Sequence, residues 1–367
     1  MDPALRSAPL LRGVAWLLAA FTAAGACSFS FEAGSPPRQA SPVPPLETVD
    51  TGGDWYTVYF TNPDDPKSRS LRGGPDRFLA EAIHLARASV DVAVQELDLW
   101  SVRDALIDAH KRGVSVRMVT ESDYLDTEEV QQLIEAGIPV LGDRREGLMH
   151  DKFVVIDRSE VWTGSMNYTI SEAYRNNNNL IRIRSAELAK DYTTEFAEMF
   201  EADQFGPGSP ANTPYPALTI EDVSLEVYYS PDDGVEQRLE QLIREAQKDI
   251  FFLAFSFTSD KLAQAILDRA AAGVTVAGVM DKSQYKSNIG SDYDTFRSAG
   301  LDVRLDGNPR NMHHKVIIID QSIVIAGSYN FTFSAETRND ENLLVIHSPE
   351  IAELFLKEFQ KVFLQAR

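Results

Sequence analysis

The sequence predicts an α/β fold made of two homologous halves, each a mixed β-sheet flanked by helices. The first observation is an internal repeat, in which HDKFVVIDRSEVWTGSMNYT (150–169) recurs as HHKVIIIDQSIVIAGSYNFT (313–332). The second is that short apolar runs alternate with helix-period stretches in both halves. Repeated β-α-β alternation is typical of a mostly parallel or mixed sheet covered by helices on both faces.

The repeat extends well beyond this block. Downstream, SEAYRNNNNLIRI (171–183) matches SAETRNDENLLVI (334–346) without a gap, and upstream VYFTNP (58–63) matches VYYSP (227–231). Such self-similarity indicates a duplication, which predicts the fold and also a site between the copies.

The domain boundaries follow from the repeat and from composition. The glycine- and proline-rich segment 206–216 (GPGSPANTPYP) is typical of a linker. We therefore predict a first repeat over 51–205, a linker over 206–216 and a second repeat over 217–367. Within the repeats, the pattern predicts strands near 90–94 and 250–255, followed by helices near 101–111 and 261–272.

The N-terminus has the pattern of an export signal. An apolar stretch over 13–24 follows a basic start and is too short to span a bilayer. Residues 1–26 are therefore predicted to be a signal peptide, followed by the protein's single cysteine, Cys27, and a Pro/Ser-rich tether over 27–50. Lipidation of Cys27 as in bacterial lipoproteins is favoured, and ordinary cleavage after Ala26 is the alternative.

Charge limits the substrates that the surface can attract. The 367 residues carry 35 basic and 55 acidic side chains, a formal charge of −20, which repels nucleic acid and anionic lipid head groups at long range. An anionic substrate must therefore be held by a local basic site. With one cysteine, no intramolecular disulfide can form.

The repeated block contains the pattern His-x-Lys-x4-Asp-x6-Gly-Ser-x-Asn. Histidine and lysine two positions apart share one face of a strand, whereas the aspartate at the seventh position beyond the histidine faces away and is predicted to anchor structure. Two copies of a pattern that is only moderately specific alone are a strong signal. The first copy is His150, Lys152, Asp157, Gly164, Ser165 and Asn167, and the second is His313, Lys315, Asp320, Gly327, Ser328 and Asn330.

These residue types suit phosphodiester chemistry. Lysine, serine and asparagine supply donors for phosphate oxygens, so we expect Ser165, Asn167, Ser328 and Asn330 to bind phosphate. Cleavage through a covalent intermediate needs a nucleophile and a proton donor, but each half supplies one motif histidine. Two halves meeting about a pseudo-twofold axis would provide both.

These motifs resemble the phospholipase D superfamily, and the GS-x-N-[YF]-T tail followed by R-N-x-x-N is similar to its bacterial endonuclease and cardiolipin hydrolase branch. The resemblance implies an α-β-α-β-α sandwich, no cofactor and no metal. It further implies that His150 attacks phosphorus, that His313 protonates the leaving group, and that Lys152, Lys315 and the two motif asparagines hold the phosphate.

The family also places an acidic residue downstream of the tail to orient a histidine. Glu341 occupies that place in the second half, and Asn178 is its counterpart in the first. If Glu341 reaches across the interface it serves His150, which favours His150 as nucleophile. If it serves His313 in its own half, the roles are exchanged.

Three hypotheses for function follow. The leading one is a metal-independent phosphodiesterase of the cell envelope that hydrolyses phospholipid through a phosphohistidine. The second is an endonuclease cleaving DNA or RNA with the same site, and the third is a catalytically silent binding or scaffold protein. A monomer would suffice because both motifs lie in one chain, and Cys27 would attach it to the membrane.

Overall fold

The computed structural model describes residues 54–367, so the predicted signal peptide, Cys27 and the tether lie outside the described residues. The first half forms a seven-stranded sheet in the order β1-β7-β6-β5-β2-β3-β4. Its elements are β1 (Tyr56–Phe60), α1 (Asp76–Leu85), β2 (Ser89–Val94), α2 (Trp100–Lys111), β3 (Ser115–Thr120), α3 (Glu128–Glu135), β4 (Val140–Gly142), β5 (Lys152–Ile156), β6 (Glu160–Gly164), α4 (Ile170–Tyr174), β7 (Asn179–Arg184) and α5 (Ala186–Ala202).

The second half forms an eight-stranded sheet in the order β12-β11-β10-β13-β14-β15-β9-β8. Three short 3-10 turns, at Ser68–Ser70, Ser122–Tyr124 and Gly206–Gly208, complete the chain's regular structure over 54–367. The elements of this half are β8 (Ala217–Ile220), β9 (Val223–Ser230), α6 (Val235–Glu245), β10 (Asp249–Ala254), α7 (Asp260–Ala271), β11 (Thr275–Met280), α8 (Lys282–Ser287), α9 (Tyr293–Ser298), β12 (Asp302–Leu305), β13 (Lys315–Ile319), β14 (Ile323–Gly327), α10 (Phe333–Thr337), β15 (Glu341–His347) and α11 (Pro349–Gln365).

Both sheets are mixed and share one topology. In each, the motif strand (β5 or β13) runs antiparallel to the strand at its side (β2 or β10), and that strand pairs in parallel with the next (β3 or β11). The parallel pairs are linked by α2 and α7, as the alternating pattern of the sequence predicts. The duplication is therefore a duplication of structure.

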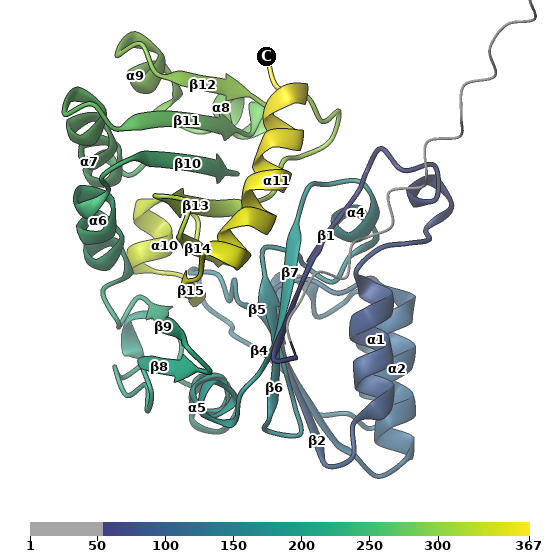
Figure 1. Cartoon of the computed structure of the whole chain (residues 1–367). Coiled ribbons are helices and arrows are strands. Elements are labelled where there is room, and N and C mark those ends of the chain that lie inside the picture. The colour runs from purple at the N-terminus through teal and green to yellow at the C-terminus, as the bar shows by residue number, and fades with distance from the viewer. Residues whose placement is uncertain (1–53) are drawn as a thin grey trace, which may run out of the picture. The chain divides into compact units, whose positions relative to one another are not determined.

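The layers place helices outside and between the sheets (Figure 1). One apolar core contains side chains of both sheets together with the buried faces of the long helices α5 and α11. Two further cores lie under α1 and α2 on the outer face of the first sheet and under α6 and α7 on the outer face of the second. The predicted α/β fold of two similar halves, layered α-β-α-β-α, is confirmed.

The long helices begin in the same way in both halves. The hydroxyl of Ser185 accepts a hydrogen bond from the backbone N–H of Leu188, and that of Ser348 does the same for Ile351. Such N-caps satisfy backbone donors that have no partner within the helix. The caps fix where α5 and α11 leave the sheets and enter the layer between them.

The motif aspartates anchor the sheets at the end away from the histidines. The carboxylate of Asp157 accepts hydrogen bonds of 2.7 to 3.1 Å from the backbone N–H groups of residues 87–89. Asp320 makes the same contacts, at 2.6 to 3.1 Å, with residues 247–249. Each aspartate thus fastens the start of the neighbouring strand.

Among the helices of residues 54–367, none combines the length and the apolar character of a membrane span.

Candidate active site

The two motifs meet because each motif strand is preceded by a contact with the other half. The backbone N–H of His150 donates to the carbonyl of Asp340 at 3.0 Å, and that of His313 donates to the carbonyl of Asn177 at 2.9 Å. These bonds extend two short bridges, Met149 with Asp340 and Asn177 with Met312. The crossed pairing brings two histidines from distant parts of the sequence to one interface.

Each histidine ring is held at Nδ1 by a group from the opposite half. Nδ1 of His150 lies 2.6 Å from Oε2 of Glu341. Nδ1 of His313 lies 3.1 Å from Oε2 of Glu172 and 3.1 Å from Oδ1 of Asn178. Fixing Nδ1 leaves Nε2 of each ring as the nitrogen that can react.

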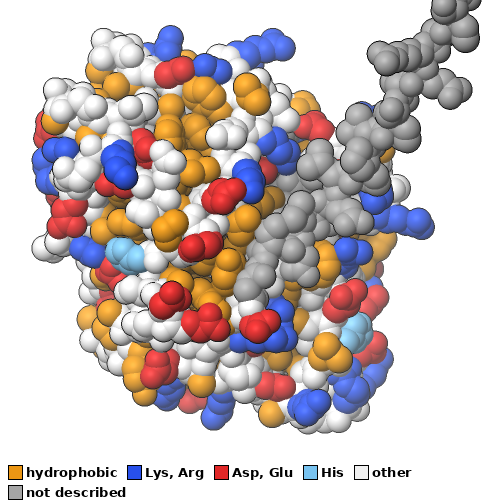
Figure 2. Space-filling model, viewed as in Figure 1, with side chains coloured by type: hydrophobic (Ala, Val, Ile, Leu, Met, Phe, Trp, Pro, Cys, Tyr) orange, Lys and Arg blue, Asp and Glu red, His pale blue; other side chains and the backbone are white. Residues whose placement is uncertain are grey.

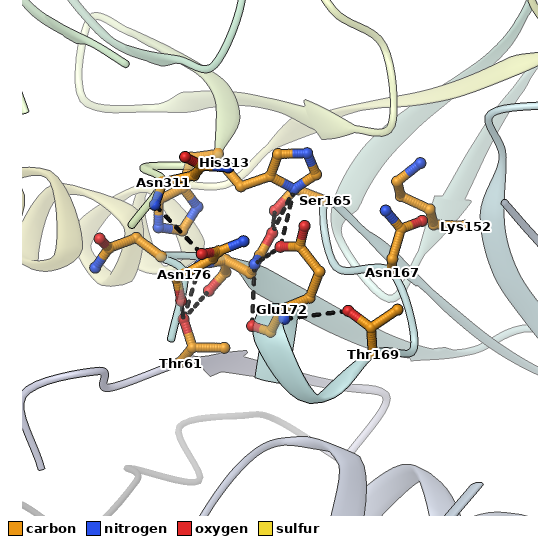
Figure 3. A network of polar contacts seen from close by, with 12 residues as sticks. Thr61, Lys152, Ser165, Asn167, Thr169, Glu172, Asn176, Asn311 and His313 are labelled. Carbon is orange, nitrogen blue, oxygen red and sulfur yellow. Dashed lines mark hydrogen bonds and ion pairs between the residues drawn. The ribbon is translucent and has the colours of Figure 1, made fainter. Parts of the chain in front are cut away.

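Glu172 is the residue that the sequence comparison missed. We expected only an amide, Asn178, beside the histidine served by the first half, whereas the structure places a carboxylate there as well (Figure 3). The expectation was wrong because the acid comes from α4 rather than from the strand-end position that Glu341 occupies in the second half. The signal was present in the alignment, where Glu172 lies opposite Ala335.

Both motif lysines are buried and point back at their own motif. Nζ of Lys152 donates to the carbonyl of His150 at 2.7 Å, and Nζ of Lys315 donates to that of His313 at 2.9 Å. Burial lowers the pKa of Lys152 to about 8; for Lys315, burial and the positive charge of Lys152 lower it to about 7. An ammonium with two further donors and little water around it is suited to binding a phosphate oxygen.

The charges of the two halves act on one another. Burial lowers the pKa of His150, and the ammonium groups of Lys152 and Lys315 lower it further. Burial likewise lowers the pKa of His313 to about 4, with Glu172 opposing and Lys315 contributing. Since each histidine responds to the lysines of both halves, the two motifs form a single site.

The carboxylates at the two histidines differ in charge state. Burial raises the pKa of Glu341 to about 7, although Lys152 and hydrogen bonds from Asn339 and Ser328 oppose the rise. Burial also disfavours the ionised form of Glu172, but the charge of His313 and hydrogen bonds from His313 and Asn178 lower its pKa to about 2. Glu172 therefore stays ionised.

The motif serines and asparagines, all four of which are expected to bind phosphate, differ in their contacts within the protein. The hydroxyl of Ser165 donates to Asn178 and that of Ser328 donates to Glu341, both at 2.9 Å, so both hydroxyls hold the groups behind the histidines. The side-chain amide of Asn330 makes no hydrogen bond to the described residues, and that of Asn167 makes a single long one, 3.5 Å, to a glutamine. The asparagines keep donors free for a ligand.

The motif glycines allow a close approach between strands at the same end. A Cβ on Gly164 would lie 2.4 Å from the carbonyl oxygen of Asn179, and one on Gly327 would lie 2.2 Å from that of Asn342. Both distances are far below contact, so any side chain would push the neighbouring strand away. The glycines hold the strand ends close enough for the serines to reach their partners.

Within residues 54–367, no group of three or more histidine, cysteine or acidic side chains is placed to hold a metal ion. The polar groups around the histidines are two lysines, two carboxylates and several amides. Two buried imidazoles, with two ammonium groups beside them at the junction of two halves of one chain, are groups suited to phosphodiester chemistry.

Comparison with known proteins identifies the family. The family model described as cardiolipin synthase, PLD-like domain, matches residues 79–200 and 239–363, so it matches both halves. The chain therefore belongs to the phospholipase D-like family and is a phosphodiesterase of that type. The predicted family is confirmed.

Individual relatives agree with this membership. The chain is 30% identical over 169 residues to a phospholipase D of Rickettsia bellii, a match that covers 46% of this chain and 83% of the relative. It is 36% identical over 133 residues to the human mitochondrial cardiolipin hydrolase, covering 35% of this chain and 52% of that protein. The structure of phosphatidylserine synthase from Haemophilus influenzae matches with a TM-score of 0.64 at 14% identity, over 84% of this chain and 87% of that one, which shows the shared fold.

Proposed function

We propose that the protein hydrolyses a phosphodiester bond of a phospholipid through a phosphohistidine intermediate. The observation that carries the proposal is the pair of buried histidines, each with its Nδ1 against a carboxylate of the other half. That arrangement gives two imidazoles whose Nε2 atoms can take different parts in one reaction, one as nucleophile and one as acid and base.

The reaction proceeds in two balanced steps. In the first, Nε2 of His150 attacks phosphorus, the bond to the leaving oxygen breaks, and His313 gives its Nε2 proton to that oxygen. In the second, His313 takes a proton from water, the hydroxide attacks phosphorus, and the phosphorus–nitrogen bond breaks to regenerate His150. Lys152, Lys315 and the motif asparagines hold the non-bridging oxygens, where negative charge develops.

Two side chains, Glu96 after β2 and Phe255 after β10, favour a lipid over a polynucleotide as substrate. Two residues beyond Val94, the β2 residue that pairs with Lys152, the half-buried carboxylate of Glu96 makes no hydrogen bond or ion pair with the described residues. In the second half, the ring of Phe255 packs edge-on against His313, with ring centroids 4.4 Å apart. A carboxylate on one side repels the neighbouring phosphates of a nucleic acid, and an aromatic ring on the other accepts apolar groups.

One face of the molecule agrees with this preference (Figure 2). The face shown in Figure 2 mixes acidic with basic side chains and has no continuous basic tract among its described residues. The formal charge of −20 acts in the same direction. A nuclease of this kind would need a basic groove along which the backbone of the nucleic acid lies.

The test compares substrates on the purified full chain. Phosphatidylcholine and cardiolipin vesicles, single-stranded DNA, duplex DNA and RNA are each incubated with the protein, with and without EDTA. We expect release of the lipid head group, unaffected by EDTA, and no cleavage of nucleic acid. Cleavage of DNA or RNA without lipid hydrolysis would replace the proposal with the nuclease hypothesis, inactivity on all substrates would favour a silent binding protein, and loss of activity in EDTA would contradict the metal-independent mechanism.

The intermediate is tested separately. In His313→Asn, the proton donor and base is removed, so a substrate with a good leaving group should phosphorylate His150 and the adduct should persist. Mass spectrometry of the peptide that contains residue 150 should then show an added phosphoryl group that still carries the second ester group of the substrate. An adduct on residue 313 in His150→Asn instead would exchange the two roles.

We also propose that Cys27 carries a lipid that holds the enzyme at the cell envelope. The proposal rests on the apolar stretch over 13–24 and on the position of the single cysteine after Ala26. Cys27→Ser should move the protein from the membrane fraction to the soluble fraction. An identical distribution of the two forms would exclude the anchor and support ordinary cleavage after Ala26.

A further inference from the structure

The two halves keep an acid beside each histidine, but at different positions of the repeat. In the second half, the acid that contacts His150 is Glu341, at the start of β15. The first half has Asn178 at the matching position. Its acid is Glu172, in the first turn of α4, where the second half has Ala335.

The position of Glu172 is built into the local fold. The backbone N–H of Glu172 donates to the hydroxyl of Thr169, which caps α4 at 3.2 Å. The side-chain amide of Asn178 donates to both the backbone carbonyl of Glu172 and its Oε2. The residue is 8% exposed, so the carboxylate is held away from solvent with its free side toward His313.

The amide at position 178 retains part of the role that Glu341 has in the other half. Ser165 donates to Asn178 as Ser328 donates to Glu341, at 2.9 Å in both cases. The oxygen of Asn178 also accepts from His313. Position 178 therefore still supports the ring, while the negative charge has moved to the helix.

We propose that Glu172 is the positioning carboxylate of His313. The acid stands on α4 in the first half and at the start of β15 in the second, and each histidine therefore has a carboxylate at its Nδ1. The proposal rests on the proposed function only in taking His313 as the proton donor. Glu172 does not reach the reacting atoms and acts through the ring of His313.

The tautomer of His313 follows from the two groups that accept hydrogen bonds at its Nδ1. Oε2 of Glu172 and Oδ1 of Asn178 both accept, so Nδ1 of His313 must carry hydrogen, and Nε2 must exchange the proton with the substrate. The groups that face His313 are Glu172, Asn178, the two motif lysines and the ring of Phe255. Glu172 is the one negative charge among them, and it favours the imidazolium that the leaving-group step needs.

The first experiment uses Glu172→Gln, which keeps the shape and removes the charge. Loss of the negative charge beside His313 should lower kcat/KM roughly 10- to 100-fold on phosphatidylcholine vesicles, because their leaving group is a poor alkoxide. On bis(p-nitrophenyl) phosphate the loss should be smaller, because p-nitrophenolate leaves with little need of a proton. Glu336→Gln, a carboxylate of α10 that contacts Tyr329 and no histidine, is the matched control and should behave as the wild type.

The second experiment moves the acid. Glu172→Ala should lose more activity than Glu172→Gln, and Glu172→Ala/Asn178→Glu recreates the Ala335 and Glu341 arrangement of the second half. The double variant should recover at least tenfold over Glu172→Ala. Equal activity of the double and single variants, with both folded by circular dichroism, would overturn the proposal.

A third measurement separates this inference from the proposed function. The pKa of His313, followed by NMR in protein labelled at histidine, should fall in Glu172→Gln, because the carboxylate stabilises the charged ring. In the rate profile, the alkaline limb should move to lower pH if His313 is the acid. An unchanged pKa of His313 would overturn the inference even if the enzyme proves inactive on every substrate offered, whereas a lowered pKa in an inactive enzyme would reject only the proposed function.

Discussion

The two halves of the molecule have the same strand order around the motif and different side chains around the histidine. The first half offers Glu172 and Asn178, and the second offers Glu341 with an alanine at the helix position. The difference teaches that a duplicated site preserves where a charge lies in space more closely than where it lies in the sequence. A short helix and a strand end pack side by side, so an acid from either can reach the same nitrogen.

The residues that follow the strands beside the motif strands differ as well. The residues that follow β2 include the acidic Glu96, whereas those that follow β10 include the aromatic Phe255. The candidate site is thus nearly symmetric at the two histidines and asymmetric away from them. A substrate with two unlike groups on its phosphate would therefore bind in one orientation, which is what separate roles for His150 and His313 require.

The largest expected effect tests whether the histidines act as a unit. His150→Ala and His313→Ala should each lower kcat by on the order of 10³-fold or more, and the double variant should lose little beyond either one. Initial rates on phosphatidylcholine vesicles measure this, with the exposed His84→Ala as control. A single variant that keeps a tenth of the activity would show that its histidine does not act as a unit with the other.

The next effect concerns the lysines, whose pKa values differ between the halves. Lys315 titrates at about 7 and Lys152 at about 8, and each binds phosphate only as a cation, so kcat/KM should fall as the pH rises above about 7. Lys315→Arg keeps its charge and should move this fall to higher pH, although the altered shape lowers the rate overall. A profile of Lys315→Arg that coincides with that of the wild type would exclude Lys315 as its origin.

A smaller effect distinguishes the asparagines that cross the interface. Asn342 donates to Asp151 at 2.8 Å and accepts from Thr163 at 2.6 Å, whereas its counterpart Asn179 contacts His314 at 3.0 Å and leaves its own oxygen unpaired. Asn342→Ala should therefore lower the free energy of unfolding by about 1–2 kcal/mol more than Asn179→Ala. Urea denaturation measures the difference, and equal costs would contradict it.

The smallest expected difference lies between the two anchoring aspartates. Asp157→Ala and Asp320→Ala should each cost about 1–2 kcal/mol and agree closely, because each carboxylate accepts from three backbone N–H groups. Burial opposes ionisation, but these hydrogen bonds lower the pKa of both carboxyls.

The pH dependence of that cost has a definite sign. A carboxyl whose pKa is lowered on folding contributes stability above its ordinary pKa of 3.8, and the contribution is lost as the pH falls through the folded-state value. Wild type and variants should therefore converge in stability in acid. A gap that stays constant from neutral to acidic pH would show that packing rather than the charge is lost.

The sequence by itself determined the duplication, the mixed α/β sheets and the motif residues of the candidate site. Alternation along a strand puts His150 and Lys152 on one face and sends Asp157 away, so the spacing of the motif suffices for these assignments. The strands and helices predicted from periodicity agree with the structure to within a residue at most ends, because those segments also form the apolar cores.

Only the tertiary structure decided which acid serves which histidine. Glu341 reaches across to His150, and Glu172, which no motif marks, takes the corresponding place at His313. An alignment compares residues at the same position of the repeat, whereas a hydrogen bond requires only that two atoms lie about 3 Å apart. The backbone pairing between the two halves and the turn of α4 that carries Glu172 set that distance.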